Sequence, residues 1–210
     1  MRQLGVPSLG VMLAMLVVGI VGGCAQSPLD SPTARPTPIK RLNTAALSVP
    51  RIDFCDLVPH LAVRQALGTK RWTRSSRGNG DTASVGTGKQ QTTDVVAEHG
   101  CRWSTPGSSP AQASAWTFAR PVHDRLARSV RSASSRERGC HDVDGPRFGH
   151  WSLTQVCRVG SPAEVRVRHA GLFGTTWLTC QVEDRSGVSD VRRRADAWCV
   201  QVANTLNTSH

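Results

Sequence analysis

Cysteine is the residue type with the most chemical potential in this chain of 210 residues, and it occurs seven times. Six of the seven cysteines are spread over the region that follows a proline-rich segment: Cys55, Cys101, Cys140, Cys157, Cys180 and Cys199. None of them forms a Cys-x-x-Cys pair, the spacing typical of zinc sites and redox motifs. An even set of cysteines in an oxidising compartment predicts disulfides, and six cysteines allow about 15 pairings. We expect Cys55–Cys101, Cys140–Cys157 and Cys180–Cys199, because neighbours along the chain tend to end up close together.

The seventh cysteine, Cys24, stands at the end of an apolar stretch over residues 4–21, which follows a short positively charged start containing Arg2. This order is typical of an export signal. The residues before the cysteine, Val21-Gly22-Gly23, complete a quartet that resembles the lipobox of bacterial lipoproteins. The resemblance implies a signal peptide over residues 1–23, cleavage before Cys24 and acylation of its thiol by palmitate-type chains. The alternatives are an uncleaved anchor or an ordinary signal that is cut nearby.

Histidines are the next candidates for chemistry, and the seven in this chain are scattered singly. No His-Glu-x-x-His motif occurs anywhere, and no Gly-x-Ser-x-Gly motif occurs outside the signal. Two pairs could meet in space, His99 with His141 or His169 with Asp184, although nothing in the spacing requires it. We therefore expect no catalytic residues, no metal and no cofactor. The alternative is an extracytoplasmic hydrolase whose site is assembled from scattered His and Asp or Glu residues.

Arginines are the residues that carry a functional hypothesis, since they make up all but three of the 26 basic residues and the formal net charge is +11. Five of them are candidate anion-binding residues: Arg125, Arg128, Arg131, Arg166 and Arg168. The first three recur every third residue on a short helix, and the last two alternate with valines on a strand. Outside the membrane such a surface would meet anionic lipid, a wall glycan or an envelope protein rather than nucleic acid. The alternative is an ordinary solvated surface in an arginine-rich protein.

The elements that position these residues follow a proline-rich tether at residues 24–50, which contains five prolines. We expect a single globular domain over residues 51–210, with a mobile polar loop at about 69–94. The expected helices are 60–67, 123–132 and 189–206, and the expected strands are 100–104, 111–122, 151–159, 163–169 and 175–182. This order has no alternation of parallel strands and helices. It predicts an α+β fold in which an antiparallel sheet of about five strands carries N- and C-terminal helices, stapled by disulfides.

Three short segments resemble a family of actinobacterial cell-envelope lipoproteins of unknown function. They are Asp53-Phe54-Cys55-Asp56-Leu57 before the first helix, Cys101-Arg102-Trp103 on a strand, and Cys199 on the terminal helix. Phe54 stands where that family usually has proline. The resemblance implies location and fold rather than a reaction: a lipid-anchored protein on the extracytoplasmic face of the cell membrane. We therefore expect a non-catalytic binding or accessory module of the cell envelope.

Overall fold

The computed structural model describes residues 37–85, 92–160 and 164–207. The predicted signal peptide and the predicted lipidation site at Cys24 lie outside these residues. The helices are α1 (His60–Leu67), α2 (Asp124–Ser134) and α3 (Val188–Asn207), with short 3-10 turns η1 (Ile39–Arg41) and η2 (Thr44–Ala46) ahead of them. The strands are β1 (Thr73–Arg77), β2 (Thr82–Val85), β3 (Thr92–Val95), β4 (Glu98–Ser104), β5 (Gln112–Phe118), β6 (Cys140–Asp142), β7 (His150–Val159), β8 (Glu164–Phe173) and β9 (Thr176–Asp184).

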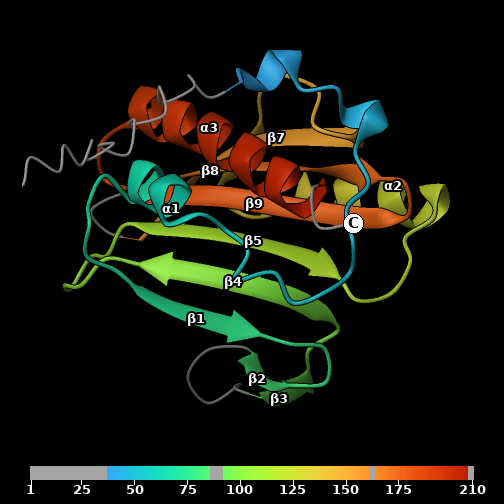
Figure 1. The fold of residues 1–210 in the computed structure, drawn as a ribbon, viewed down its shortest axis with the longest axis horizontal. Helices are drawn as coiled ribbons and strands as arrows, with labels where there is room; N and C mark the ends of the chain where they lie inside the picture. Colours follow the sequence, from blue (N-terminus) through green and yellow to red (C-terminus); the bar gives the residue numbers. More distant parts are fainter. Residues whose placement is uncertain (1–36, 86–91, 161–163, 208–210) are drawn as a thin grey trace, which may run out of the picture. The chain divides into compact units, whose positions relative to one another are not determined.

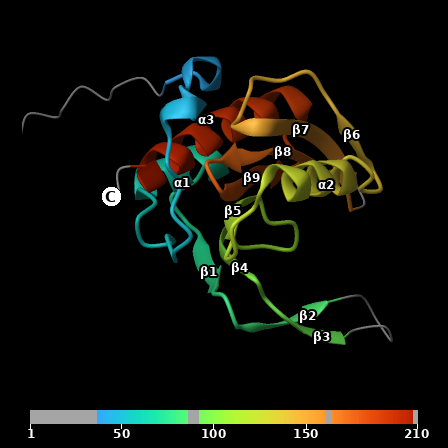
Figure 2. The same cartoon turned by 90° about the vertical axis from the view of Figure 1, so that its right-hand side faces the viewer.

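Seven of the strands form one antiparallel sheet in the order β1-β4-β5-β9-β8-β7-β6. Figure 1 shows this order from β1 to β7, and Figure 2 shows β6. The chain folds β7, β8 and β9 as consecutive hairpins, and β9 then pairs with β5 from the earlier hairpin. This arrangement confirms the α+β class and the antiparallel sheet. The expected number of strands was wrong, because the sheet has seven strands rather than about five.

The two additional strands, β1 and β6, form the edges of the sheet. All five residues of β1, Thr-Arg-Ser-Ser-Arg, are exposed, and β6 has only three residues. An edge strand that buries no side chain leaves no hydrophobic alternation in its sequence. The segment 69–94, expected as a loop, also contains most of the hairpin formed by β2 and β3.

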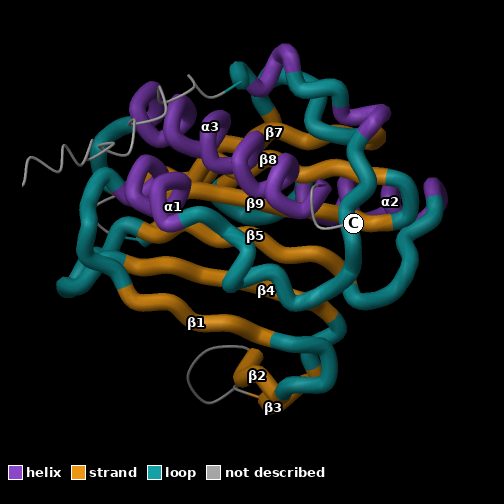
Figure 3. The backbone as a smooth tube through the Cα atoms, in the orientation of Figure 1, coloured by secondary structure: helices purple, strands orange, loops and turns teal. Residues whose placement is uncertain are grey.

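Helices α1 and α3 cover one face of the sheet and enclose the main core (Figure 3). Trp198 of α3 packs edge-on against Trp103 of β4, with ring centroids 5.2 Å apart, and its indole N–H donates to the backbone oxygen of Ser114 at 3.1 Å. Helix α1 ends at Gly68, whose positive φ of 71° closes the last turn with a bond to the Arg64 oxygen. No helix in the described ranges is both long enough and apolar enough to cross a membrane.

Helix α2 lies on the opposite face of the sheet, over β7 (Figure 2). A second, smaller core forms there from Val122, Ala127, Leu153, Ala170, Leu172 and Trp177. The helices were expected mainly on one face of the sheet, so the position of α2 differs from that expectation. Because α2 is only 11 residues long, the part of this face over β4 and β5 remains without a covering helix.

Three disulfides join elements of the domain, and their pairing is the expected one. Cys55–Cys101 attaches the segment before α1 to β4, and Cys140–Cys157 links the paired strands β6 and β7. Cys180–Cys199 joins β9 to α3. The sheet is therefore cross-linked to the N-terminal segment, to its own edge strand and to the C-terminal helix.

The ordered domain begins earlier than residue 51, since residues 37–50 pack along α3. Ile39 and Val49 are both buried in the main core. The backbone N–H of Ser48 donates to the side-chain oxygen of Asn207 near the end of α3, at 3.0 Å. The second half of the expected tether is therefore part of the folded domain.

Candidate functional site: a charged hollow in the open face of the sheet

A hollow of about 340 Å³ lies on the face of the sheet that α1 and α3 leave free. Its side chains come from five adjacent strands, β1, β4, β5, β9 and β8. The alternation of each strand separates them from the core. On β4, Cys101 and Trp103 are buried toward the helices while Arg102 faces the hollow, and on β8, Val167 is buried while Arg166 and Arg168 face it.

Two arginines of β8, Arg166 and Arg168, make several contacts with neighbouring side chains at the hollow. Arg168 is only 8% exposed; its Nη1 lies 2.6 Å from Glu137 Oε2, and its Nε donates to Gln181 Oε1 at 3.0 Å. The guanidinium carbon also lies 5.8 Å from the centre of the Trp116 ring, in cation–π geometry. Arg166 Nη2 lies 3.3 Å from Glu137 Oε1, so a single carboxylate bridges both arginines.

Burial shifts the pKa of three groups at the hollow. Burial lowers the pKa of Arg168 because it disfavours the charged guanidinium, although Glu137 partly offsets this effect. Burial raises the pKa of Glu98 against the opposing charge of Arg77, whose Nη2 lies 3.1 Å away. Burial likewise raises the pKa of Glu183, against the opposing charge of Arg166 at 3.6 Å. Shifted pKa values concentrated in one concave site are typical of functional sites.

The hollow also retains unused capacity to donate hydrogen bonds. The Nε of Arg166 is buried without a hydrogen-bond partner. Arg102 is exposed on β4 and takes part in none of the ion pairs formed among the described residues. Gly100, which has no side chain, also lines the hollow and pairs with Trp116 across β4 and β5. A ligand that enters the hollow would thus meet the exposed guanidinium of Arg102, whereas Arg166 Nε is buried and lies 3.6 Å from Glu183 Oε2.

The structure separates the five arginines of the sequence hypothesis into two groups with different partners. Arg166 and Arg168 lie in the hollow and are paired with acidic residues rather than freely solvated. On α2, Arg128 stacks over the Trp151 ring at 5.1 Å, and Arg131 Nε donates to the backbone oxygen of Ser152 at 3.1 Å. Arg125 is exposed on the same helix. Arg128 and Arg131 therefore contact the start of β7, and none of the three α2 arginines lines the hollow.

Four further charged or aromatic residues of the lining were not predicted as functional from the sequence: Arg77, Glu98, Arg102 and Trp116. The same holds for Glu137 and Glu183, which pair with the arginines of the lining. Within β4, the spacing of Glu98, Gly100 and Arg102 is a period-2 signal that was available in the sequence. The remaining partners meet only because β4, β5, β9 and β8 are adjacent. Strand order of that kind is a long-range property, and no local pattern encodes it.

The strongest arrangement for the hydrolase alternative is a chain formed by Thr154, His169 and Asp196. His169 is fully buried, with Nδ1 3.1 Å from Thr154 Oγ1 and Nε2 2.8 Å from Asp196 Oδ1. Thr154 is nevertheless only 5% exposed, and a Cβ atom on Gly145 would lie 2.3 Å from its hydroxyl oxygen. The backbone at Gly145 thus covers the hydroxyl, and the three residues act as a polar link between β7, β8 and α3.

The histidine pairs considered in the sequence do not form. Asp184 binds Arg194 and lies outside the contacts of His169. Within the described ranges, no two histidines share a hydrogen bond or a ring contact; His150 instead lies 3.7 Å from Asp124 at the start of α2. The arrangement of the histidines therefore does not support the hydrolase alternative.

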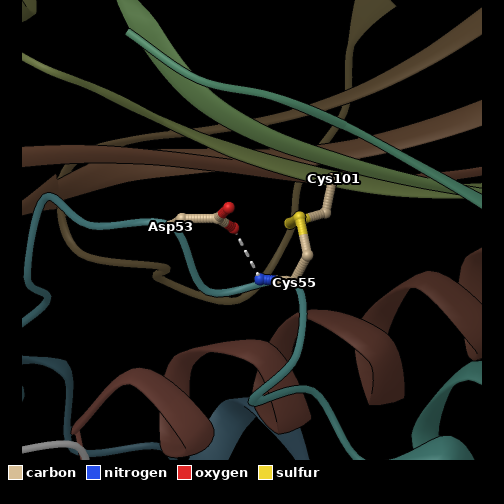
Figure 4. A group of neighbouring side chains, drawn as sticks. All are labelled: Asp53, Cys55 and Cys101. Carbon is tan, nitrogen blue, oxygen red and sulfur yellow. Dashed lines mark hydrogen bonds between the residues drawn. A yellow bond between two sulfur atoms is a disulfide. The ribbon is translucent and has the colours of Figure 1, made fainter.

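Two clusters bring sulfur and carboxylate atoms within 4.8 Å of one another, Asp53 with Cys55 and Cys101, and Glu137 with Cys140 and Cys157. In both clusters the sulfurs are joined in a disulfide, and it is the thiolate that binds metals. Figure 4 shows the role of Asp53 instead: its Oδ1 accepts a hydrogen bond from the backbone N–H of Cys55 at 3.1 Å. This carboxylate shapes the turn that presents Cys55 to Cys101.

The sequence matches no protein-family model and no curated protein. Among solved structures, the chain is similar to the extracellular domain of PknH from Mycobacterium tuberculosis, with a TM-score of 0.45 and 12% sequence identity. The superposition covers 81% of this chain and 100% of that domain. The function therefore has to be inferred from the hollow itself.

Proposed function

We propose that this chain is a lipid-anchored envelope protein whose domain binds an anionic ligand in the hollow, without catalysing a reaction. The observation that carries the proposal is the convergence of four arginines, Arg77, Arg102, Arg166 and Arg168, on one concave face. Two of them, Arg166 and Arg168, have side chains only 16% and 10% exposed. Burying charged groups costs free energy unless they are paired, and here Glu137 and Glu183 supply the partners.

The location outside the cytoplasm is supported by the three disulfides, because such cross-links persist in oxidising compartments and are rare in the cytosol. The export signal and the lipobox-like quartet ending at Cys24 point the same way. Attachment to the membrane through Cys24, and membership of the actinobacterial envelope lipoproteins, are parts of this proposal. Two or three acyl chains would anchor the protein stably, whereas one chain binds only marginally.

The anionic character of the ligand follows from the charges that line the hollow. Its four arginines face three carboxylates: Glu98 in the lining, Glu183 beside Arg166, and Glu137, which bridges Arg166 and Arg168. Burial raises the pKa of Glu98 and of Glu183. Arg102 is exposed and forms no ion pair among the described residues, although its charge opposes the rise in the pKa of Glu183. Guanidinium groups bind carboxylates and phosphates with paired, charge-assisted hydrogen bonds.

Anchoring is tested by the intact mass of the protein extracted from membranes, measured before and after reduction. The wild-type protein should carry a lipid adduct, and reduction should add about six hydrogens from three disulfides. The Cys24→Ala variant should lose the adduct and keep the six-hydrogen gain. A mature wild-type protein without an adduct would overturn the lipid anchor.

Binding is tested by calorimetric titration with two probes, inorganic phosphate and D-galacturonate. Arg102→Ala should weaken the binding of both probes by about tenfold, equivalent to about 1.4 kcal/mol. Its fold should be preserved, since Arg102 is exposed and holds no ion pair. Arg64→Ala, which removes an exposed arginine from α1 on the opposite face, is the matched control and should leave the affinities unchanged. Equal losses in both variants would show attraction by net charge rather than a site.

A further inference from the structure

The residue that bridges the two arginines of the hollow, Glu137, does not belong to the sheet. It lies in the connection between α2 and β6, and its two oxygens contact different guanidinium groups, those of Arg166 and Arg168. Glu137 is not one of the residues that line the hollow, yet it holds two that do. A carboxylate from outside the sheet thus occupies the position where an anion contacts both Arg166 and Arg168.

The position is accessible to exchange. The Glu137 side chain is 34% exposed, whereas that of Arg168 is 10% exposed, so the carboxylate lies between the buried arginines and solvent. The backbone at Glu137 is held on both sides, since its N–H donates to the Ser134 oxygen and its oxygen accepts from the N–H of Cys140. Rotation of the side chain alone would therefore uncover the arginine pair without rearranging the loop.

We infer that the Arg166–Arg168 pair is the seat for the carboxylate of an acidic sugar, and that Glu137 occupies this seat as an internal competitor until the ligand displaces it. The inference rests on the proposed function and names the ligand class for the same hollow. The ligand carboxylate would take over the two contacts of Glu137, one guanidinium to each oxygen. The buried Nε of Arg166 lies on the same group.

The sugar part of the inference comes from the rest of the lining. Trp116 is half-buried in the lining of the hollow, with the Arg168 guanidinium carbon 5.8 Å from the centre of its ring. A sugar would pack on the part of the ring that Arg168 leaves uncovered. Ser75, Ser114 and Gln181 offer hydroxyl and amide groups along the same face. A pyranose ring matches this combination, because its C–H groups can pack on an aromatic ring while its hydroxyls bond to polar side chains. A hollow of about 340 Å³ is at the lower end of small-molecule sites, as expected for one sugar unit.

Competition by Glu137 has a measurable consequence. When the binding-competent state is only partly populated, the apparent affinity falls by that fraction. Glu137→Gln removes the competing charge, which leaves Arg168 without a carboxylate partner and Arg166 with Glu183 alone. This variant should therefore bind D-galacturonate about tenfold more tightly than the wild-type protein.

Calorimetric titration of the full folded protein tests this inference, with Asp56→Asn as the control. Asp56 is an exposed carboxylate before α1 that pairs with Arg74, so its loss changes the net charge equally, away from the hollow. The affinity for D-galacturonate should rise in Glu137→Gln and stay at the wild-type value in Asp56→Asn. Neutral D-galactose should bind at least about tenfold more weakly than galacturonate. Glu137→Asp, which keeps the charge on a shorter side chain, should give an intermediate affinity.

Two results would overturn the inference in different ways. In the first, Glu137→Gln does not bind galacturonate more tightly, while Arg102→Ala still weakens phosphate binding. This result would refute the internal competitor and leave the proposed function intact. Failure of both anions to bind the wild-type protein and Glu137→Gln would refute both. Equal binding of galactose and galacturonate would refute the carboxylate seat.

Discussion

At the scale of single residues, the open face of the sheet differs from the helix-covered face in carrying charges that are partly withdrawn from water. Glu98 shows the consequence most simply, because burial raises the pKa of its carboxyl even though Arg77 lies 3.1 Å away. A carboxyl whose pKa is raised in the folded state binds its proton more tightly there than in the unfolded chain. Its contribution to stability is therefore greatest at low pH and is lost as the pH rises through the folded-state pKa.

Glu98→Gln removes this pH-dependent contribution. The wild type should lose stability relative to Glu98→Gln as the pH rises from about 4 through the raised pKa toward 7. Urea unfolding at several pH values measures this difference. A difference that grows in favour of the wild type with rising pH would mean that Arg77 outweighs burial and that the pKa is lowered.

His169 is a second residue-scale case, with a structural role. Its fully buried ring joins Thr154 on β7 to Asp196 on α3. His169→Ala leaves a cavity and unpaired polar atoms, so it should lower the unfolding free energy by about 2–4 kcal/mol. His123→Ala, at an exposed position before α2 with no side-chain capping bond, should change it by at most about 0.5 kcal/mol. Equal effects in urea unfolding would contradict the structural role of His169.

At the scale of elements, the sequence predicted the strands and helices that bury a hydrophobic pattern. Val165 and Val167 alternate with Arg166 and Arg168, and this alternation predicted a strand with both arginines on the same face. Strand β1 could not be predicted in this way, since none of its five side chains is buried. Its position depends on backbone pairing with β4, which ends with Thr73 opposite Ser104. The hollow was missed for the same reason, because pairing across β4, β5, β9 and β8 assembles it.

A close crossing of elements at Gly171 on β8 gives a sharp prediction about packing. A Cβ atom there would lie 1.7 Å from the backbone oxygen of Phe148. Gly171→Ala should therefore lower the unfolding free energy by about 3 kcal/mol or more, since a backbone atom cannot move aside cheaply. The control is Gly78→Ala, where the nearest atom, on the Asp81 side chain, is 3.5 Å away. In urea unfolding, a loss below about 1 kcal/mol for Gly171→Ala would contradict this packing.

The disulfides link elements over different loop lengths. Replacing both cysteines of Cys140–Cys157, separated by 17 residues, should cost about 3 kcal/mol in the chain-entropy description. The same change at Cys55–Cys101, separated by 46 residues, should cost about 4 kcal/mol. Urea unfolding of the two double-serine variants under oxidising conditions measures both losses. A larger loss for the shorter loop would show that native-state contacts outweigh chain entropy.

At the scale of the whole molecule, the sequence supported the α+β class, the disulfide pairing and the three helices. It did not indicate that α2 packs on the opposite face from α1 and α3 and leaves the rest of that face open. Which face a helix covers depends on the second core around Leu153, Ala170 and Trp177. Those residues come together only after β7, β8 and β9 have paired.

The central claim is that the open face of the sheet, rather than the arginines of α2, is the binding site. An amide chemical-shift titration of the ¹⁵N-labelled protein with D-galacturonate and with inorganic phosphate tests it directly. The largest changes should fall on β4, β5, β8 and β9, around Arg102, Trp116 and Arg168. Changes concentrated at Arg125, Arg128 and Arg131 on α2 would contradict the account.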